Sequence, residues 1–442
     1  MLSILGDRTY RHLFAAQVVA LVGTGLATVA LGLLAYDIAG ADAGSVLGTA
    51  LAIKMVAYVV IAPAVGAMAG RLPRRALLVG ADLVRAGAAL ALPFVDQVWQ
   101  VYVLIFVLQA ASAAFMPAFQ AAIPEVLPDE RDYTRALSLS RLAYDLESLL
   151  SPALAAVLLS MTTYNWLFSG TVVGFLASAA LVVSVTVPKS GAAPRTGGFS
   201  ARATAGGRLF LAIPRLRALL ALDLAVAAAG AVVLVNTVVY VREHLGRPAG
   251  DVALALGAYG AGSMAVALVL PRLLDRVSDR AVMLRGALLI VAVFAGLAAI
   301  TAAGAGAWRW PALLGAWAAF GTASSMVLTP SGRLIRRSSG PADRTELFAA
   351  RFSLSHGCWL LTYPLAGWLG SVAGLQAAVV TLGAVACAAG CSAARLWPRA
   401  GTRPVPHLHT SLAAGHPHLA DAIPVAGGWR HSHARVLDGL HR

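Results

Sequence analysis

Runs of about 20 apolar residues follow one another along most of the chain, and short polar segments separate them. A helix of about 20 apolar residues spans the roughly 30 Å of bilayer hydrocarbon. The pattern therefore predicts an all-α integral membrane protein with twelve transmembrane helices. The expected spans are 13–35, 46–69, 76–95, 98–122, 136–160, 164–187, 219–241, 252–270, 281–301, 308–330, 347–370 and 374–396.

The polar segments divide the chain into four parts. A stretch rich in Gly, Ala, Ser, Pro and Arg separates the sixth run from the seventh, and the last apolar run stops at Pro398. We predict an N-terminal six-helix bundle, a cytoplasmic linker, a C-terminal six-helix bundle and a disordered, histidine-containing cytoplasmic tail. Their expected bounds are 1–187, 188–218, 219–397 and 398–442.

Charge and composition fit a membrane protein rather than a nucleic-acid-binding one. Charged residues make up 12% of the chain, whereas soluble domains average about 25%. The net charge of +14 comes mainly from arginines that cluster in the loops on one side of the expected membrane. By the positive-inside rule, both termini are expected in the cytoplasm, with the chain in the bacterial cytoplasmic (inner) membrane. No nucleic-acid partner is expected.

The two halves repeat each other at matching places. The segment Gly70–Ala81 (GRLPRRALLVGA) follows the second span, and Asp275–Ala287 (DRVSDRAVMLRGA) follows the eighth. The fifth span opens with SLSR at 138–141, and the eleventh opens with SLSH at 353–356. Two six-helix halves related by an axis along the membrane normal form a transporter architecture, with the substrate site between them at the bilayer midplane.

On these features the chain resembles the major facilitator superfamily of transporters over roughly residues 8–397. The family loop after the second span reads approximately Gly-x-x-x-Asp-Arg-x-x-Arg-Arg. Here Gly70 takes the place of the acid, while the copy in the second half keeps Asp275. The resemblance implies a conformational latch in these loops. The residues assigned to it are Gly66, Arg71, Arg74, Arg75, Asp82, Arg85, Asp275 and Arg276.

Two further stretches resemble an exporter subgroup of that family. They are Gly80–Leu92 and Ile123–Leu159. The subgroup includes siderophore exporters and nickel-resistance permeases, and some of those permeases carry histidine-rich cytoplasmic tails. The resemblance implies export of a siderophore or of a metal.

Ionisable residues inside the expected spans are candidates for proton coupling and for the cavity. Each costs about 2.5–3.5 kcal/mol at the bilayer centre, so those present are expected to face a partner or a cavity. Asp145 lies four residues after Arg141 on one helix face, whereas Glu147 faces another direction. The alternative interpretations are that these charged residues form structural pairs, that those near the membrane surface are solvated, and that the histidine belongs to the core. The candidates are Lys54, Arg141, Asp145, Glu147, Asp223 and His356.

Seven of the ten histidines lie in the tail, from His407 onward, and most form His-x-His pairs. Neutral imidazoles suit nickel, cobalt and zinc. We therefore expect tail-bound nickel, cobalt or zinc and no other cofactor. A solvated tail with incidental histidines is the alternative. The candidate metal ligands are His407, His409, His416, His418, His431 and His433.

The sequence shows no nucleophile–base set and no phosphate-binding loop, so we predict a transporter and not an enzyme. We expect secondary active efflux coupled to protons, with a divalent transition metal, nickel or cobalt, as the first choice of cargo. The expected partners are the lipid bilayer, a small solute or metal ion, and protons, and the expected state is a monomer. Export of drugs or siderophores is one alternative, and a non-transporting membrane metal sensor is another.

Overall fold

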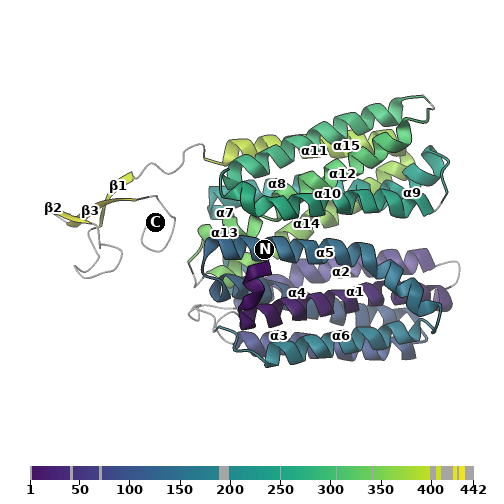
Figure 1. Ribbon diagram of the computed structural model, residues 1–442, viewed down its shortest axis with the longest axis horizontal. Coiled ribbons are helices and arrows are strands. Elements are labelled where there is room, and N and C mark those ends of the chain that lie inside the picture. Colours follow the sequence, from purple (N-terminus) through teal and green to yellow (C-terminus); the bar gives the residue numbers. More distant parts are fainter. Residues whose placement is uncertain are drawn as a thin grey trace.

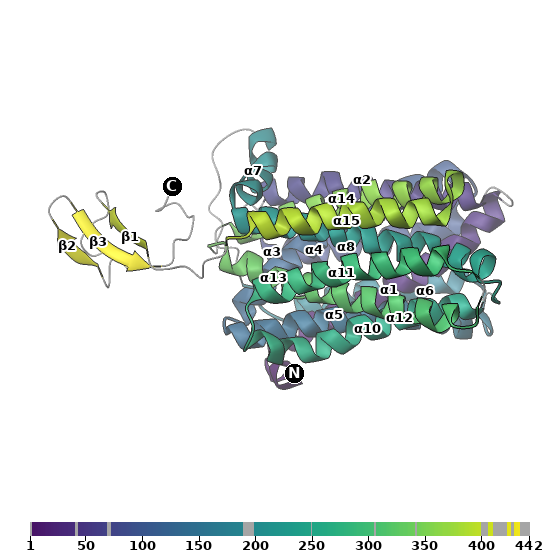
Figure 2. The ribbon, with the colours of Figure 1, turned by 90° about the horizontal axis from the view of Figure 1, so that it is seen from above.

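The computed structural model describes residues 2–39, 43–68, 72–188, 199–248, 250–304, 306–340, 343–398, 405–409, 422–425 and 428–433. Helices fill two lobes that lie side by side with their long axes parallel (Figure 1). A short linker helix and a small sheet near the C-terminus lie at one end of these lobes (Figures 1 and 2).

The first lobe contains α1 to α6, with the short 3-10 helices η1 and η3. Their bounds are η1 Leu2–Gly6, α1 Arg8–Ala39, α2 Ala43–Ala67, α3 Arg74–Ala91, η3 Leu92–Phe94, α4 Val98–Val126, α5 Glu130–Leu159 and α6 Asn165–Val183.

The second lobe contains α8 to α15, and α8 continues through two π-helical turns and α9 to His244. Their bounds are α8 Pro214–Ala231, η4 Val232–Asn236, α9 Thr237–Val239, η5 Tyr240–His244, α10 Gly250–Leu274, α11 Asp279–Ala302, α12 Arg309–Leu328, α13 Ser331–Arg337, α14 Arg344–Val372 and α15 Gly374–Leu396.

Within the described residues, ten helical segments are long and apolar enough to cross a membrane. Helices α5 and α14 are of similar length and occupy the fifth and eleventh positions of the expected pattern, but their apolar runs carry more polar residues. Together they complete the twelve spans that the sequence predicts. The prediction of an all-α membrane fold with two six-helix bundles is confirmed.

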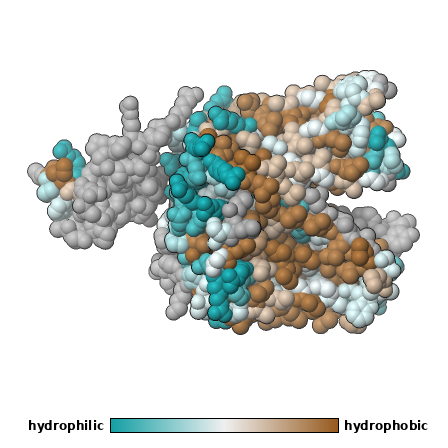
Figure 3. Space-filling model, in the orientation of Figure 1, coloured by the Kyte–Doolittle hydropathy of each residue, from teal (hydrophilic) through white to brown (hydrophobic). Residues whose placement is uncertain are grey.

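The ends of the bundle differ in polarity. Helix α1 begins and α15 ends at the same end, which also carries the linker helix, and we call it the linker end (Figure 1). Hydrophilic residues gather there, whereas apolar residues cover the sides (Figure 3). At the opposite end, the far end, the two lobes are parted (Figure 3). Helix α13, which contains Arg333, Arg336 and Arg337, lies at this polar end (Figure 1).

Helices α10 and α12 pack with almost no space between their backbones. A Cβ atom added at Gly262 would lie 2.0 Å from the carbonyl oxygen of Ala318, and one added at Gly321 would lie 1.9 Å from that of Tyr259. Small residues permit such close approach, and packing of this kind stabilises helix pairs where lipid supplies no hydrophobic driving force.

The linker and the seventh span differ from expectation. Within the expected linker 188–218, residues Phe199–Ala212 form helix α7, and the next helix begins at Pro214 rather than at residue 219. Proline is well suited to the first turn of a helix, because an N–H group at that position would have no acceptor within the helix. Because Arg215 and Arg217 interrupt the apolar run, the hydropathy pattern predicted the start of this helix too late.

The tail is not wholly without structure, contrary to expectation. Strands β1 (Val405–His409), β2 (Ile423–Val425) and β3 (Gly428–His433) form an antiparallel sheet in the order β1-β3-β2. We expected disorder because of the prolines. Pro406 and Pro424 lie in the two outer strands, however, where a missing N–H does not interrupt a central ladder.

The contact between α10 and α12 makes a testable prediction for stability. We expect Gly262→Ala to lower the thermal stability of the purified protein, because overpacking costs roughly 1–3 kcal/mol. The matched control is Gly257→Ala on the same helix, where an added Cβ meets no atom within 4 Å. Equal melting temperatures for the two variants would contradict the close packing.

Candidate functional site

Charged side chains join the two lobes at the linker end. Arg333 and Arg337 of α13 both reach Glu130 of α5 through Nε atoms, at 2.7 and 2.6 Å. The same two arginines contact Asp279 of α11 at 3.3 and 2.7 Å. We call these four residues the linker-end network. Because Glu130 belongs to the first lobe and the others to the second, the network closes this end.

Asp129 caps the start of α5, next to Glu130, which contacts the second lobe. The carboxylate of Asp129 accepts hydrogen bonds from the backbone N–H groups of Arg131, at 2.8 Å, and Asp132, at 3.0 Å. These bonds, that of Asp132 first, lower the pKa of the Asp129 carboxyl. A carboxylate in this position satisfies free N–H groups of the first helical turn.

Three residues of the predicted latch lie at the contact between the lobes. An added Cβ at Gly66 would lie 3.3 Å from the Cβ atom of Ala349, so α2 and α14 approach closely there. Arg74 binds Glu125 at 2.7 Å and donates to Thr345 of the other lobe at 3.3 Å. Asp275 lies 3.6 Å from Arg131, and both side chains are exposed, so this ion pair contributes little.

The other predicted latch residues do not bridge the lobes in the described part of the chain. Asp82 and Arg85 form the ion pair that their spacing predicts, and both are buried within the first lobe. Arg85 also lies between the rings of Phe115 and Phe175. The pair therefore holds α3, α4 and α6 together.

Arg75 donates a hydrogen bond to the carbonyl of Val183 in its own lobe. Arg276 is exposed and lies in the turn that follows α10. Gly70 and Arg71 lie outside the described residues. The first copy of the repeated loop thus reaches the second lobe through Arg74 and Gly66.

Deeper in the bundle, a carboxylate of α5 is bonded to the other lobe. Asp145 accepts a hydrogen bond of 2.6 Å from the hydroxyl of Ser263 on α10 and pairs with Arg141 at 3.0 Å. Arg141 donates to the same hydroxyl at 2.9 Å. The two residues that sequence spacing places on one face therefore meet at a third group, which belongs to the opposite lobe.

A backbone carbonyl links the other pair of facing helices. Pro63 lies inside α2 and has no N–H, so the carbonyl of Val59, four residues earlier, lacks its helical partner. The hydroxyl of Ser353 on α14 donates to that carbonyl at 2.6 Å. The proline thus creates an acceptor that the second lobe uses.

Lys54 and Glu147 are charged residues of the interior whose charges are not balanced by a direct ion pair among the described residues. They come from α2 and α5 and are close enough for their charges to interact. Among the described residues, however, no carboxylate oxygen lies within 4.0 Å of the Lys54 ammonium. Glu147 accepts one hydrogen bond, of 3.4 Å, from Ser151. Its charge is therefore available to a proton or to a ligand.

Gly25 of α1 makes room for this carboxylate. An added Cβ would lie 2.7 Å from Glu147 Oε1, 1.9 Å from Ser151 Oγ and 2.4 Å from Ser151 Cβ. Rotation of the serine hydroxyl cannot relieve the last of these contacts. Helices α1 and α5 can therefore lie this close only because residue 25 has no side chain.

An aromatic cluster lies between the lobes next to Lys54. The ring of His356 lies 4.7 Å from that of Tyr58 and 4.2 Å from that of Phe352. The ammonium of Lys54 lies 5.7 Å from the Tyr58 ring. His356 donates its Nδ1–H to the carbonyl of Phe352 at 2.7 Å, since a carbonyl can only accept, and this leaves Nε2 with the lone pair.

Asp223 is neither solvated nor near the start of its helix. It is 2% exposed, lies nine residues after Pro214, and accepts a hydrogen bond of 3.1 Å from Arg351 of α14. The solvated alternative for this residue is therefore wrong. The ion pair joins α8 to α14 within the second lobe.

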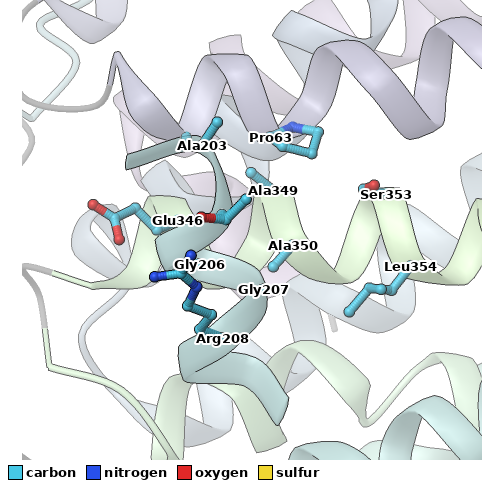
Figure 4. A pocket seen from close by; sticks show the side chains of 12 residues that line it. Pro63, Ala203, Gly206, Gly207, Arg208, Glu346, Ala349, Ala350, Ser353 and Leu354 are labelled. Carbon is cyan, nitrogen blue, oxygen red and sulfur yellow. The ribbon is translucent and has the colours of Figure 1, made fainter. Parts of the chain in front are cut away.

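The linker helix α7 covers the junction of the lobes. It borders a pocket of ≈ 430 Å³ whose other walls come from α2 and α14, with Arg208 and Glu346 at one side and Leu354 at the other (Figure 4). An added Cβ at Gly206 would lie 2.7 Å from the carbonyl oxygen of Glu346. Helix α7 therefore packs directly on α14 at the closed end.

Sequence reasoning missed the partners contributed by the opposite lobe. Ser263, Arg351 and Glu130 are distant in sequence from the groups they bind, and no local spacing identifies them. Arg333 and Arg337 lie four residues apart beside a cluster of arginines, which was the available signal.

The general model for the major facilitator superfamily matches residues 13–311 and 220–431 of this chain. The chain belongs to the major facilitator superfamily. Membership identifies a multi-pass membrane transporter rather than an enzyme.

Some curated relatives of this chain are macrolide efflux proteins. Macrolide efflux protein A of Streptococcus pyogenes is 28% identical over 184 residues, which cover 40% of this chain and 45% of that protein. Its namesake from Enterococcus faecalis is 30% identical over 155 residues, covering 33% of this chain and 48% of the relative. The match therefore spans about half of the length of these relatives.

Solved structures of the superfamily share the fold. The human organic anion transporter MFSD10 superposes with a TM-score of 0.74 at 14% identity, covering 87% of this chain and 99% of that one. A bacterial homologue of the iron transporter ferroportin, in an outward-facing state, gives 0.72 at 14% identity, covering 88% and 99%. At such low identity these structures show the fold alone.

Within the described residues, no group of three or more His, Cys, Asp or Glu is placed to hold a metal ion. Of the tail histidines, His407, His409, His431 and His433 are described by the positions of their backbone in strands but not by their side chains, while His416 and His418 lie outside the described residues. Metal binding by the tail therefore remains a prediction.

The linker-end network predicts that Glu130 controls closure of that end. Glu130→Gln is expected to raise the rate of maleimide labelling at Ala349→Cys, in a chain whose native cysteines are serines, because α2 and α14 separate more often. An effect of about tenfold corresponds to about 1.4 kcal/mol of lost closure. Asp132→Asn, which removes a pair within α5 alone, is the control and should leave the labelling rate unchanged.

Gly25 predicts a second, independent effect. Gly25→Ala should reduce transport by about tenfold or more, because a displacement of about 1 Å at a positioned group has effects of that order. Gly87→Ala on α3, where an added Cβ meets no atom within 4 Å, is the control. Full activity of Gly25→Ala at equal expression would show that the position of Glu147 does not matter.

Proposed function

We propose that this transporter exports an organic compound from the cytoplasm and that inward proton flow drives the export. The observation that carries the cargo class is the aromatic cluster of Tyr58, Phe352 and His356 between the lobes, beside the charges of Lys54 and Glu147. Aromatic rings with a few polar groups are typical of sites for organic ligands, whereas the imidazole of His356 belongs to no group of three potential metal ligands among the described residues.

The state of the interior carboxylates also favours an organic cargo over a metal ion. Asp145 and Asp223 are each held by an arginine, so a metal ion could bind them only by displacing a cation already in place. The similarity to macrolide efflux proteins points in the same direction. Nickel or cobalt export is the second candidate, and the histidines of the tail are the observation that favours it.

Orientation and coupling complete the proposal. With both termini in the cytoplasm of a bacterial cell, the linker end faces the cytoplasm and the parted far end faces outward, which allows cargo release and entry of protons. Glu147 is the proposed proton carrier because it has no direct ion pair within the part of the chain that the structure describes. Proton transfer onto Asp145 would weaken its bonds to Arg141 and Ser263 and so loosen α5 from α10.

Transport into everted membrane vesicles tests the proposal. A radiolabelled macrolide and nickel are supplied in parallel, with an imposed inward-acidic proton gradient. We expect saturable macrolide uptake that depends on the gradient and falls by about a hundredfold in Glu147→Gln, as loss of a proton-transfer group typically costs. Asp96→Asn, an exposed carboxylate at the far end, is the control and should transport normally.

Two results would overturn the proposal in different ways. Gradient-driven nickel uptake without macrolide uptake would assign the metal as cargo. Macrolide uptake that continues at full rate in Glu147→Gln would exclude this residue as the proton carrier.

A further inference from the structure

We propose that the tail sheet carries a transition-metal site on one face, built from histidines of two paired strands. The site would take a borderline-soft divalent cation such as Ni²⁺, Co²⁺ or Zn²⁺. It goes beyond the transport of an organic compound, because it lies in the tail at the linker end and not between the lobes (Figure 1).

The register of the sheet carries the proposal. Strands β1 and β3 are antiparallel, and His407 is directly opposite His431. Residues directly opposite each other in such a pair have Cβ atoms about 4.5–5.5 Å apart. Two imidazoles from such positions can share one metal ion, since metal–nitrogen bonds are about 2.0–2.1 Å long.

The neighbouring histidines occupy the same face. His433 is opposite Val405, and His409 is opposite Trp429. Because successive residues of a strand alternate between faces, the positions of His407 and His409 on β1 share a face with those of His431 and His433 on β3. Four of the tail histidines are thus at positions of one face, with the directly opposed pair between the other two.

The arrangement differs from chelation by a loose tail. Ordering a loose segment around an ion costs conformational entropy, whereas strands that are already paired hold the backbones of His407 and His431 directly opposite each other. Imidazole nitrogens favour nickel, copper and zinc over calcium and magnesium, which prefer oxygen. Magnesium is therefore a suitable negative control.

The full-length protein in detergent tests the site by isothermal titration calorimetry with NiCl₂ and ZnCl₂. The informative variant exchanges two neighbours, His431→Ser with Ser432→His, so that the number of histidines stays the same. Position 432 is opposite Pro406, on the other face. Loss of one of two linked ligands weakens binding by on the order of a hundredfold, and we expect such a loss in the exchange variant.

Three comparisons decide the outcome. His407→Ala with His431→Ala should weaken binding as much as the exchange variant does, and Ser432→Ala should bind like the wild type. In a second measurement, Ni²⁺ should protect the bond after Arg430, in β3, from trypsin in the wild type and not in the exchange variant. Wild-type affinity in the exchange variant would overturn the proposal, as would a wild type that binds neither metal.

Discussion

An ionised side chain in hydrocarbon must have a partner, and this constraint governs the interior of the transporter. Asp82 is paired with Arg85, Asp145 with Arg141, and Asp223 with Arg351. Each of these pairs contributes to contacts between helices, and each buries two charges. Among the described residues, Lys54 and Glu147 have no partner of opposite charge in direct contact and interact with each other only at a longer distance, so they differ from these three pairs.

The contacts between the lobes form a series along the bundle axis. Charges close the linker end, and the bonds of Ser263 with Asp145 and of Ser353 with Val59 lie deeper in the bundle. Both deeper bonds use a serine from the second lobe and an oxygen acceptor from the first. A change of state must break the whole series, and a serine hydroxyl released from such a bond can turn back to a carbonyl of its own helix.

The sequence predicted what depends on local spacing and on hydropathy. The twelve spans follow from the length of the apolar runs, and the repeat of the halves follows from matching segments. The pair of Asp82 with Arg85 follows from their spacing of three residues on one helix. The partners Ser263 and Arg351 did not follow, because they lie more than a hundred residues away from Asp145 and Asp223 along the chain. The tail sheet was not predicted, because prolines in a segment indicate disorder. Only the order of the strands shows that these prolines lie in the outer strands, where they are tolerated.

The proline of α2 has a consequence for water. The carbonyl of Val59 has lost its helical partner to Pro63 and is satisfied by Ser353 from the other lobe. When the lobes separate at this level, that oxygen has no acceptable alternative but water, because a bare carbonyl in an apolar interior is costly. An opening of the linker end at this level would therefore hydrate α2 near Val59, and solvent would take part in the energetics of the change.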